Sequence, residues 1–422
     1  MKFKGEVLHT ILTQILCLIF GVGVSILLNR VLGPTLKGEL VALLLIPQLI
    51  VSFINLGLGM SGSYFMGKRE YPDGEIVKTN LLATLLLGII GIGIGWWIFA
   101  NVFPNISLLL KLILLSLVIW DLWLCYVPDF FLGKGLITQH NIWNLSRHIG
   151  KFFLIAIFFI TFRDKSVETH CNASLLSSAI VAISCVGGLS FLLSFPVLSR
   201  WIKLRGKVNF SYLKKGVNFG YKLFLIDLLA FLNYRLDILL LKIFTDATKV
   251  GYYSTAVYMV ECLWLIPRAV YLAFYSRFVT GKLEKGEGNR ILRLTLWITA
   301  LVGVGSVFFI KPIINFLYTP SFLPAFSPYV ILLPGVIALV LPKLLMSEVM
   351  GSWGRPEILL WGMLITVGVN IGLNIFFIPK YGMNGAALAS TIAYICELVF
   401  FVLIYKKRSS VLEISLKNIF RK

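Results

Sequence analysis

The chain has 422 residues, of which 58% are hydrophobic and 14% charged, and its formal net charge is +20 at pH 7. This composition excludes an ordinary soluble domain, in which about a quarter of the residues are charged. The basic excess could suggest nucleic acid binding, but these residues lie between apolar stretches rather than in one basic region. We therefore expect an integral membrane protein whose basic loops meet lipid headgroups, with no nucleic acid partner.

Twelve apolar stretches follow one another along the chain, and a helix needs about 20 such residues to cross a bilayer. They are residues 7–28, 39–60, 80–100, 107–132, 149–162, 174–198, 217–241, 251–275, 291–317, 324–350, 358–378 and 386–405. The fifth is the shortest, and the loops leave no room for a separate soluble domain. The predicted fold class is an all-α integral membrane protein with twelve transmembrane helices.

The charged linker 200–215 divides these stretches into two sets of six, which predicts lobes 1–205 and 206–422. An even number of spans in each lobe gives both lobes the same orientation, as in transporters built from parallel repeats. Gly38 and Gly251 close corresponding loops of the two lobes, which is a faint trace of such a repeat. Lys and Arg concentrate in the linker and in every second loop, so both termini are predicted to be cytoplasmic.

Charged residues inside the apolar stretches are candidates for function, because a charge near the bilayer centre costs roughly 2.5–3.5 kcal/mol on insertion scales. Lys222 and Arg235 lie near span ends, where long side chains reach the interface. The deeper charges are expected to face the bundle interior, either in structural ion pairs or along a wet cavity; they are Asp121, Asp227, Glu261, Arg268 and Glu397. Glu261 and Arg268 are seven residues apart, so a continuous helix would place them on one face, about 10.5 Å apart along its axis.

Prolines inside the spans predict bends, since proline removes a backbone donor. They are Pro47, Pro128, Pro267, Pro334 and Pro342. Static kinks and helices that flex around a cavity are both consistent with this pattern.

Motifs for chemistry are absent from the sequence. There is no G-x-x-x-x-G-K-[ST] phosphate loop, no H-E-x-x-H and no G-x-S-x-G, and the four histidines have no metal-ligand spacing. We therefore predict no catalytic residue, no metal and no cofactor, and a protein that is not an enzyme. The enzyme alternative is a membrane glycan polymerase, which usually carries a larger external loop than any predicted here.

Three segments carry motifs at turns. Residues 29–38 are Asn-Arg-Val-Leu-Gly-Pro-Thr-Leu-Lys-Gly, residues 235–241 begin Arg-Leu-Asp and lead to Val250-Gly251-Tyr252-Tyr253, and residues 370–387 contain Asn370, Asn374, Ile378-Pro379 and Tyr381-Gly382. They are similar to R-x-L-G-P-x-x-x-G, to D-x-x-x-L followed by V-G-x-Y-x-x-A, and to N-x-x-L-N-x-x-x-I-P-x-Y-G-x-x-G-A-A. These patterns occur in the polysaccharide-transporter branch of the multidrug/oligosaccharidyl-lipid/polysaccharide (MOP) exporter superfamily, the Wzx-type flippases. Thr35-Leu36 departs from the smaller residues common after the Gly-Pro turn.

This resemblance implies two six-helix lobes around a central cavity that opens alternately to each side of the inner membrane. It implies a flippase for an undecaprenyl-diphosphate-linked oligosaccharide in surface polysaccharide biosynthesis (O-antigen, capsule or exopolysaccharide), with polysaccharide polymerase machinery as a further partner. Arg30, Lys222, Arg235, Arg268 and Lys343 are then the candidates for binding the diphosphate. Asp121, Asp227, Glu261 and Glu397 are candidates for ion coupling or for balancing those charges. A multidrug or metabolite cation antiporter of the same superfamily is the alternative and would favour an acidic cavity.

Overall fold

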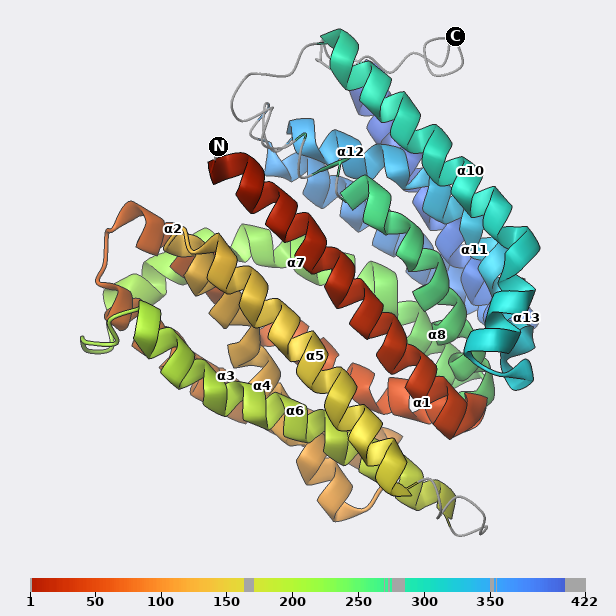
Figure 1. Cartoon of the computed structure of the whole chain (residues 1–422), viewed down its shortest axis with the longest axis horizontal. Coiled ribbons are helices and arrows are strands. Elements are labelled where there is room, and N and C mark those ends of the chain that lie inside the picture. Colours follow the sequence, from red (N-terminus) through yellow and green to blue (C-terminus); the bar gives the residue numbers. More distant parts are fainter. Residues whose placement is uncertain are drawn as a thin grey trace. The chain divides into compact units, whose positions relative to one another are not determined.

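The computed structural model describes residues 2–162, 171–268, 270–271, 274, 285–349, 353 and 355–406, and all regular structure in these ranges is helical (Figure 1). The α-helices are α1 (Lys2–Ile54), α2 (Leu58–Lys68), α3 (Asp73–Val102), α4 (Leu108–Gly133), α5 (Ile137–Phe162), α6 (Cys171–Trp201), α7 (Phe210–Phe244), α8 (Ala247–Glu261), α10 (Lys285–Leu317), α11 (Phe326–Ala338), α12 (Val340–Glu348) and α13 (Pro356–Lys406). Two 3-10 helices, η2 (Cys262–Trp264) and η3 (Pro320–Ala325), lie between them. The basic tail 407–422 and residues 277–284, which follow the predicted span 251–275, lie outside the described residues.

Seven helical segments of the described chain are long and apolar enough to cross a membrane. They are Leu12–Ile54, Asp73–Val102, Leu108–Gly133, Leu175–Trp201, Gly288–Leu317, Pro320–Val349 and Glu357–Lys406. Their outward faces carry large apolar side chains; on α10, Phe308 and Phe316 are 78% and 77% exposed. Such surfaces require a hydrocarbon environment, so the chain is a multi-pass membrane protein.

Two of the longest helices are broken at glycines that the motifs predicted to form turns. Gly33 in α1 has φ 66° and ψ 179°, and Gly382 in α13 has φ 56° and ψ −132°. Positive φ values are unfavourable for residues with a Cβ, so these glycines permit the breaks between spans one and two and between spans eleven and twelve.

Prolines account for two further interruptions. Pro267 has no N–H to donate to the carbonyl of Leu263, and the preceding turn, Cys262–Trp264, is a 3-10 helix. Pro342 likewise cannot bond the carbonyl of Ala338, and the predicted span 324–350 is divided there into α11 and α12. The regular α-helix is interrupted at both positions, whereas Pro128 and Pro334 lie inside α4 and α11.

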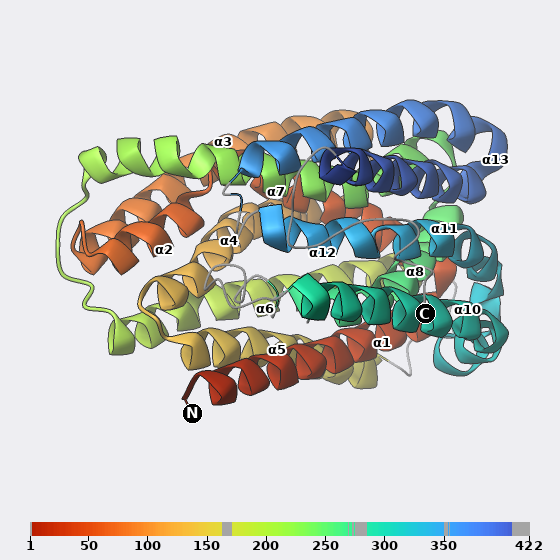
Figure 2. The same cartoon turned by 90° about the horizontal axis from the view of Figure 1, so that it is seen from above.

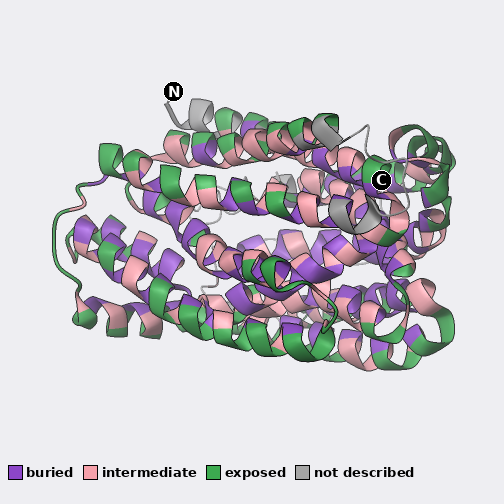
Figure 3. Cartoon of the chain, turned by 90° about the horizontal axis from the view of Figure 1, so that it is seen from below, coloured by how far each residue is buried: buried purple, intermediate pink, exposed green. Residues whose placement is uncertain are grey.

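The chain forms two compact units. The first comprises Met1–Leu32 and Leu40–Leu228, and in it α4 packs against α2, α3, α5 and α6. The buried face of α4 is rich in large side chains, including Trp123, Tyr126 and Phe130. Figure 3 shows buried and exposed residues on opposite sides of individual helices, as expected for helices that face lipid on one side.

The second unit comprises Gly33–Glu39 and Leu229–Lys422. Here α11 lies against α13, α8 and α10 (Figure 2). The division between the units falls inside α7, because the first half of α7 packs on the first unit; Tyr212, for example, donates a hydrogen bond to Asn80 Oδ1. The lobe boundary at 205/206 derived from the linker stays a prediction.

Candidate functional site

Four charged residues singled out in the sequence lie together in the second unit. Arg235 on α7 forms a two-pronged ion pair with Glu261 at the end of α8: Nη2–Oε2 is 3.3 Å and Nη1–Oε1 is 3.4 Å. Lys343 on α12 interacts electrostatically with both Glu261 and Glu397. Glu397 on α13 is buried and accepts a hydrogen bond from Thr366 Oγ1 at 3.2 Å. The cluster thus contains two cations and two carboxylates.

The two cations differ in what they contact. The ammonium of Lys343 lies 3.9 Å from the centre of the Trp264 ring and 5.2 Å from that of Tyr234, and it donates a hydrogen bond to Tyr234 Oη at 3.3 Å. Tyr394 completes the aromatic group, with its ring centre 6.3 Å from that of Tyr234 and 6.5 Å from that of Trp264. None of the ion pairs between described residues involves Lys343.

An aromatic ring attracts an ammonium through its quadrupole but carries no net charge. The three rings, which we call the aromatic seat (Tyr234, Trp264 and Tyr394), therefore position Lys343 without neutralising it. An ammonium has three N–H donors, and the contacts above leave donors for an anion. Arg235, in contrast, directs both of its Nη atoms to Glu261. The arrangement can bind an anion at Lys343 while Arg235 remains paired.

The structure corrects two details of the sequence interpretation. Glu261 and Arg268 do not share one continuous helical face, because the 3-10 turn before Pro267 interrupts the helix, and Arg268 is exposed. Arg235 does not extend to the interface alone but pairs with Glu261. Asp237 on the next turn is only 2% exposed, since Tyr253 and Ser390 cover it and bond to it.

The remaining candidates lie in the first unit and do not form one cluster. Arg30, Lys222 and Asp227 are exposed. Asp121 on α4 is half-buried and interacts electrostatically with Arg147 and Lys151 of α5.

Several residues of these sites were missed in the sequence. The aromatic seat was missed because no spacing in the sequence connects residues 234, 264 and 394. The pair Arg147 and Lys151 was missed because the fifth span is short, although two cations four residues apart on one helix face were a usable signal. Asp129, whose carboxylate interacts with that of Asp227, was not among the candidates chosen from the sequence.

The first motif (residues 29–38) and the segment of the second motif around Gly251 contact each other in the second unit. Thr35 Oγ1 and Thr248 Oγ1 are 2.9 Å apart. A Cβ on Gly38 would lie 1.7 Å from the carbonyl oxygen of Ala247, and one on Gly251 would lie 1.9 Å from that of Pro34. An offset of 213 residues relates Pro34 to Ala247, Thr35 to Thr248 and Gly38 to Gly251, so each close approach has a counterpart with the two segments exchanged. The contact is therefore approximately two-fold symmetric, as two copies of a repeat would produce, and it requires glycine at both crossing points.

A buried hydrogen-bond chain joins other motif residues. Asn374 donates to Asn370 Oδ1 at 2.8 Å, Asn370 donates to Ser390 Oγ at 3.2 Å, and Ser390 donates to Asp237 Oδ2 at 3.3 Å. Tyr253 also donates to this carboxylate. All five side chains are at most 2% exposed. The second and third motifs therefore hold α7, α8 and both parts of α13 together.

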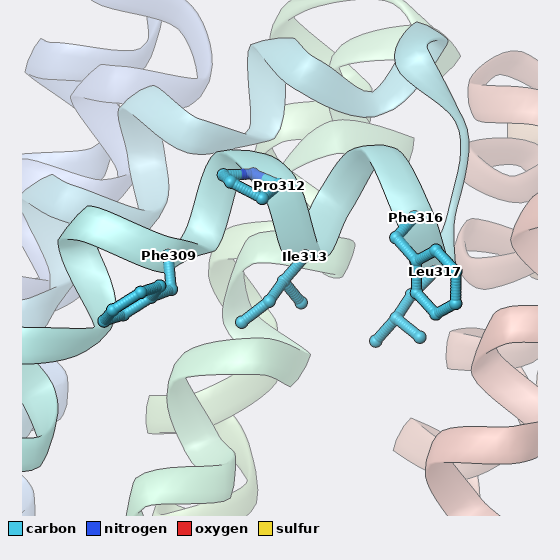
Figure 4. Close-up of a pocket in the computed structure, with 5 residues that line it drawn as sticks. All are labelled: Phe309, Pro312, Ile313, Phe316 and Leu317. Carbon is cyan, nitrogen blue, oxygen red and sulfur yellow. The ribbon is translucent and has the colours of Figure 1, made fainter.

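A groove of about 520 Å³ lies along α10 beside Pro312, and it is lined by Phe309, Pro312, Ile313, Phe316 and Leu317 (Figure 4). All five side chains belong to one helix and none carries a polar group. The groove suits hydrocarbon and offers nothing to a charged ligand, so the candidate site remains the cluster around Lys343.

Comparison with known proteins decides the family. Residues 4–267, well over half of the chain, match the family model described as "Polysaccharide biosynthesis protein". The chain belongs to this family. No protein of curated function matches the sequence. The resemblance drawn from the three motifs is thereby confirmed at the level of the family.

Solved structures share the fold of this family member. The lipid II flippase MurJ in an inward closed conformation matches with a TM-score of 0.76 and 16% identity, over 97% of this chain and 88% of that chain. An inward-facing multidrug resistance MATE transporter of the MOP superfamily matches at 0.70 and 13%, over 93% and 94%. A mutant of the Vibrio cholerae MATE transporter VcmN matches at 0.63 and 16%, over 96% and 97%. The protein therefore has a MOP-transporter fold.

Proposed function

We propose that this protein is a flippase that moves an undecaprenyl-diphosphate-linked oligosaccharide from the inner to the outer leaflet by alternating access. In this proposal twelve transmembrane helices form two six-helix lobes around a central cavity in the inner membrane, with both termini cytoplasmic. Membership of the polysaccharide biosynthesis family and the fold shared with a lipid II flippase support the proposal.

The observation that carries the proposal is the environment of the Lys343 ammonium, which lies in the aromatic seat. A diphosphate is a compact anion that binds a point charge such as ammonium. The Lys343 ammonium lies against aromatic rings and forms no ion pair with a described residue, and such rings also offer apolar faces on which a sugar can stack. Arg235 and Arg268 add positive charge in the same unit, and Glu261 and Glu397 balance it when no substrate is bound. Arg30 and Lys222 are proposed to attract the diphosphate elsewhere along its path.

A direct test uses proteoliposomes that contain the purified protein and a fluorescent undecaprenyl-diphosphate disaccharide. Dithionite added outside quenches only lipids in the outer leaflet, so flipping increases the fraction that is quenched. We expect the native protein to accelerate quenching and Lys343→Gln, incorporated to the same density, to do so much less. Equal rates in protein-free liposomes and in liposomes with native protein would refute the function.

The competing function is a cation antiporter, which the shared fold with MATE transporters allows. The observation in its favour is the pair of carboxylates Asp129 and Asp227 in the first unit, which interact with each other. An antiporter would move a cationic dye against a proton or sodium gradient in the same liposomes. A flippase would leave the dye gradient unchanged while quenching of the lipid proceeds. Asp121, Asp227, Glu261 and Glu397 remain proposed coupling residues in either case.

A further inference from the structure

The linker between α6 and α7 is clamped along the start of α3 (the yellow-green connection in Figure 2), and we call residues 200–215 the basic strap. The Lys78 ammonium donates to the carbonyl of Gly206 at 2.9 Å, Asn209 N donates to Thr79 Oγ1 at 2.9 Å, and Asn209 Nδ2 donates to Glu75 Oε2 at 2.8 Å. Three hydrogen bonds therefore attach this segment to α3. From its composition alone, the segment would be expected to be a free linker.

Two glycines allow the close approach that this clamp needs. A Cβ on Gly74 would lie 2.0 Å from the carbonyl oxygen of Arg205. Gly206 has φ 134° and sits against the side chain of Glu75. Ile202 and Tyr212, near the two ends of the strap, are buried, and Tyr212 donates a hydrogen bond to Asn80 Oδ1 of α3.

The cations of the strap are exposed. Arg200, Lys203, Arg205, Lys207 and Lys214 are all exposed, and none forms a hydrogen bond or ion pair with a described residue. Lys215 is the exception, because it pairs with Glu70 at 2.8 Å and lies over the Tyr71 ring. A fixed backbone thus presents five uncompensated charges on one segment.

Large apolar side chains stand between these charges. Trp201 is 45% exposed, Val208 is 38% exposed and Phe210 is 67% exposed. Trp201 is also the last residue of the membrane-spanning segment Leu175–Trp201. Exposed aromatic residues at the end of a span mark the level of the lipid headgroups. The strap therefore lies where phospholipid phosphates are, which distinguishes it from a patch aimed at a soluble acidic protein.

We propose that the basic strap is a binding site for anionic phospholipid headgroups, such as phosphatidylglycerol, at the membrane surface. The clamp keeps the cations at headgroup level, and Trp201, Val208 and Phe210 insert among the acyl chains beside them. Each basic residue near a charged bilayer surface contributes attraction equivalent to about a fivefold change in binding. This proposal is independent of the substrate that the protein transports.

The test measures binding of short-chain phosphatidylglycerol to the full-length protein in detergent by native mass spectrometry. We expect Lys203→Gln/Arg205→Gln/Lys207→Gln to weaken phosphatidylglycerol binding at least tenfold, with phosphatidylcholine bound weakly by both proteins. The matched control is Lys311→Gln/Arg355→Gln/Lys380→Gln, which removes the same charge from three exposed positions elsewhere and should retain native binding.

Two further arms decide the outcome. Lys203→Arg/Lys207→Arg keeps the charge and should keep the affinity, which separates lost charge from a damaged fold. A competition with inorganic pyrophosphate distinguishes a lipid headgroup from a soluble anion as the ligand. If an equal concentration of pyrophosphate displaces phosphatidylglycerol from the protein, the site binds a soluble anion and the proposal is overturned. Equal loss of phosphatidylglycerol in the strap variant and the matched control, or no loss in either, would also overturn the proposal.

Discussion

The contrast between Lys343 and Arg235 leads to a quantitative prediction about anion binding. Lys343 lies in the aromatic seat without an ion-pair partner among the described residues, whereas Arg235 is paired with Glu261. A hydrogen bond to a charged group contributes about 1.5–3 kcal/mol, which corresponds to roughly 10- to 150-fold in affinity. Lys343→Gln should therefore weaken the binding of pyrophosphate by a factor in this range.

The comparison that tests this reasoning removes the paired charges together. Arg235→Gln/Glu261→Gln leaves the net charge of the site unchanged, so we expect a change in pyrophosphate affinity of less than about fivefold, since exchange of a partly exposed pair contributes ~1 kcal/mol at most. Trp264→Leu keeps the net charge and an apolar side chain but removes the ring. A cation–π contact contributes about 0.5–2 kcal/mol, which predicts a loss of roughly 2- to 30-fold.

Isothermal titration of pyrophosphate into the full-length protein in lipid nanodiscs measures all three variants. The thermal unfolding midpoint of each variant serves as the control for folding. The reasoning is refuted if the paired substitution weakens binding as much as Lys343→Gln does, because Arg235 would then be the anion-binding cation. Native affinity in Trp264→Leu would show that the ring does not position Lys343.

Further predictions concern the motifs, a helix cap and the topology. Gly251→Ala should sharply reduce the amount of folded protein in membranes, because its Cβ would lie 1.9 Å from the Pro34 carbonyl oxygen, whereas Gly305→Ala meets nothing within 4 Å and should be neutral. The pKa of Asp246 lies below its ordinary value: burial opposes the shift, but the bonds from the backbone N–H and ammonium of Lys249 outweigh it. Asp246→Ala should therefore destabilise the protein by about 0.5–2 kcal/mol at neutral pH, as loss of an N-cap does, and the difference in unfolding midpoint should shrink as the pH falls below the ordinary carboxyl pKa of 3.8. A constant difference down to acid pH would contradict the role of the carboxylate. Reporter fusions in the strap and after Lys422 should both indicate a cytoplasmic location, and an external signal from either would contradict the predicted orientation.

The sequence alone determined the class of the protein and many of its breaks. Apolar stretches of about 20 residues leave few alternatives to membrane-spanning helices, because a bilayer cannot satisfy an unpaired backbone. The turns at Gly33 and Gly382 and the interruptions before Pro267 and Pro342 were also predictable, since glycine and proline act on the backbone locally. The motifs at these turns were specific enough to indicate the family.

Only the tertiary structure decided which charges meet. Arg235 and Glu261 are 26 residues apart, and Lys343 reaches Tyr234 across 109 residues, so no spacing rule for a single helix connects them. The aromatic seat depends on α7, α13 and a 3-10 turn, and the basic strap depends on Gly74 in α3 and Gly206 in the strap, which permit close approach. Pairing, burial and the sharing of hydrogen-bond donors are properties of neighbours in space, and those neighbours are set by packing rather than by any one segment of sequence.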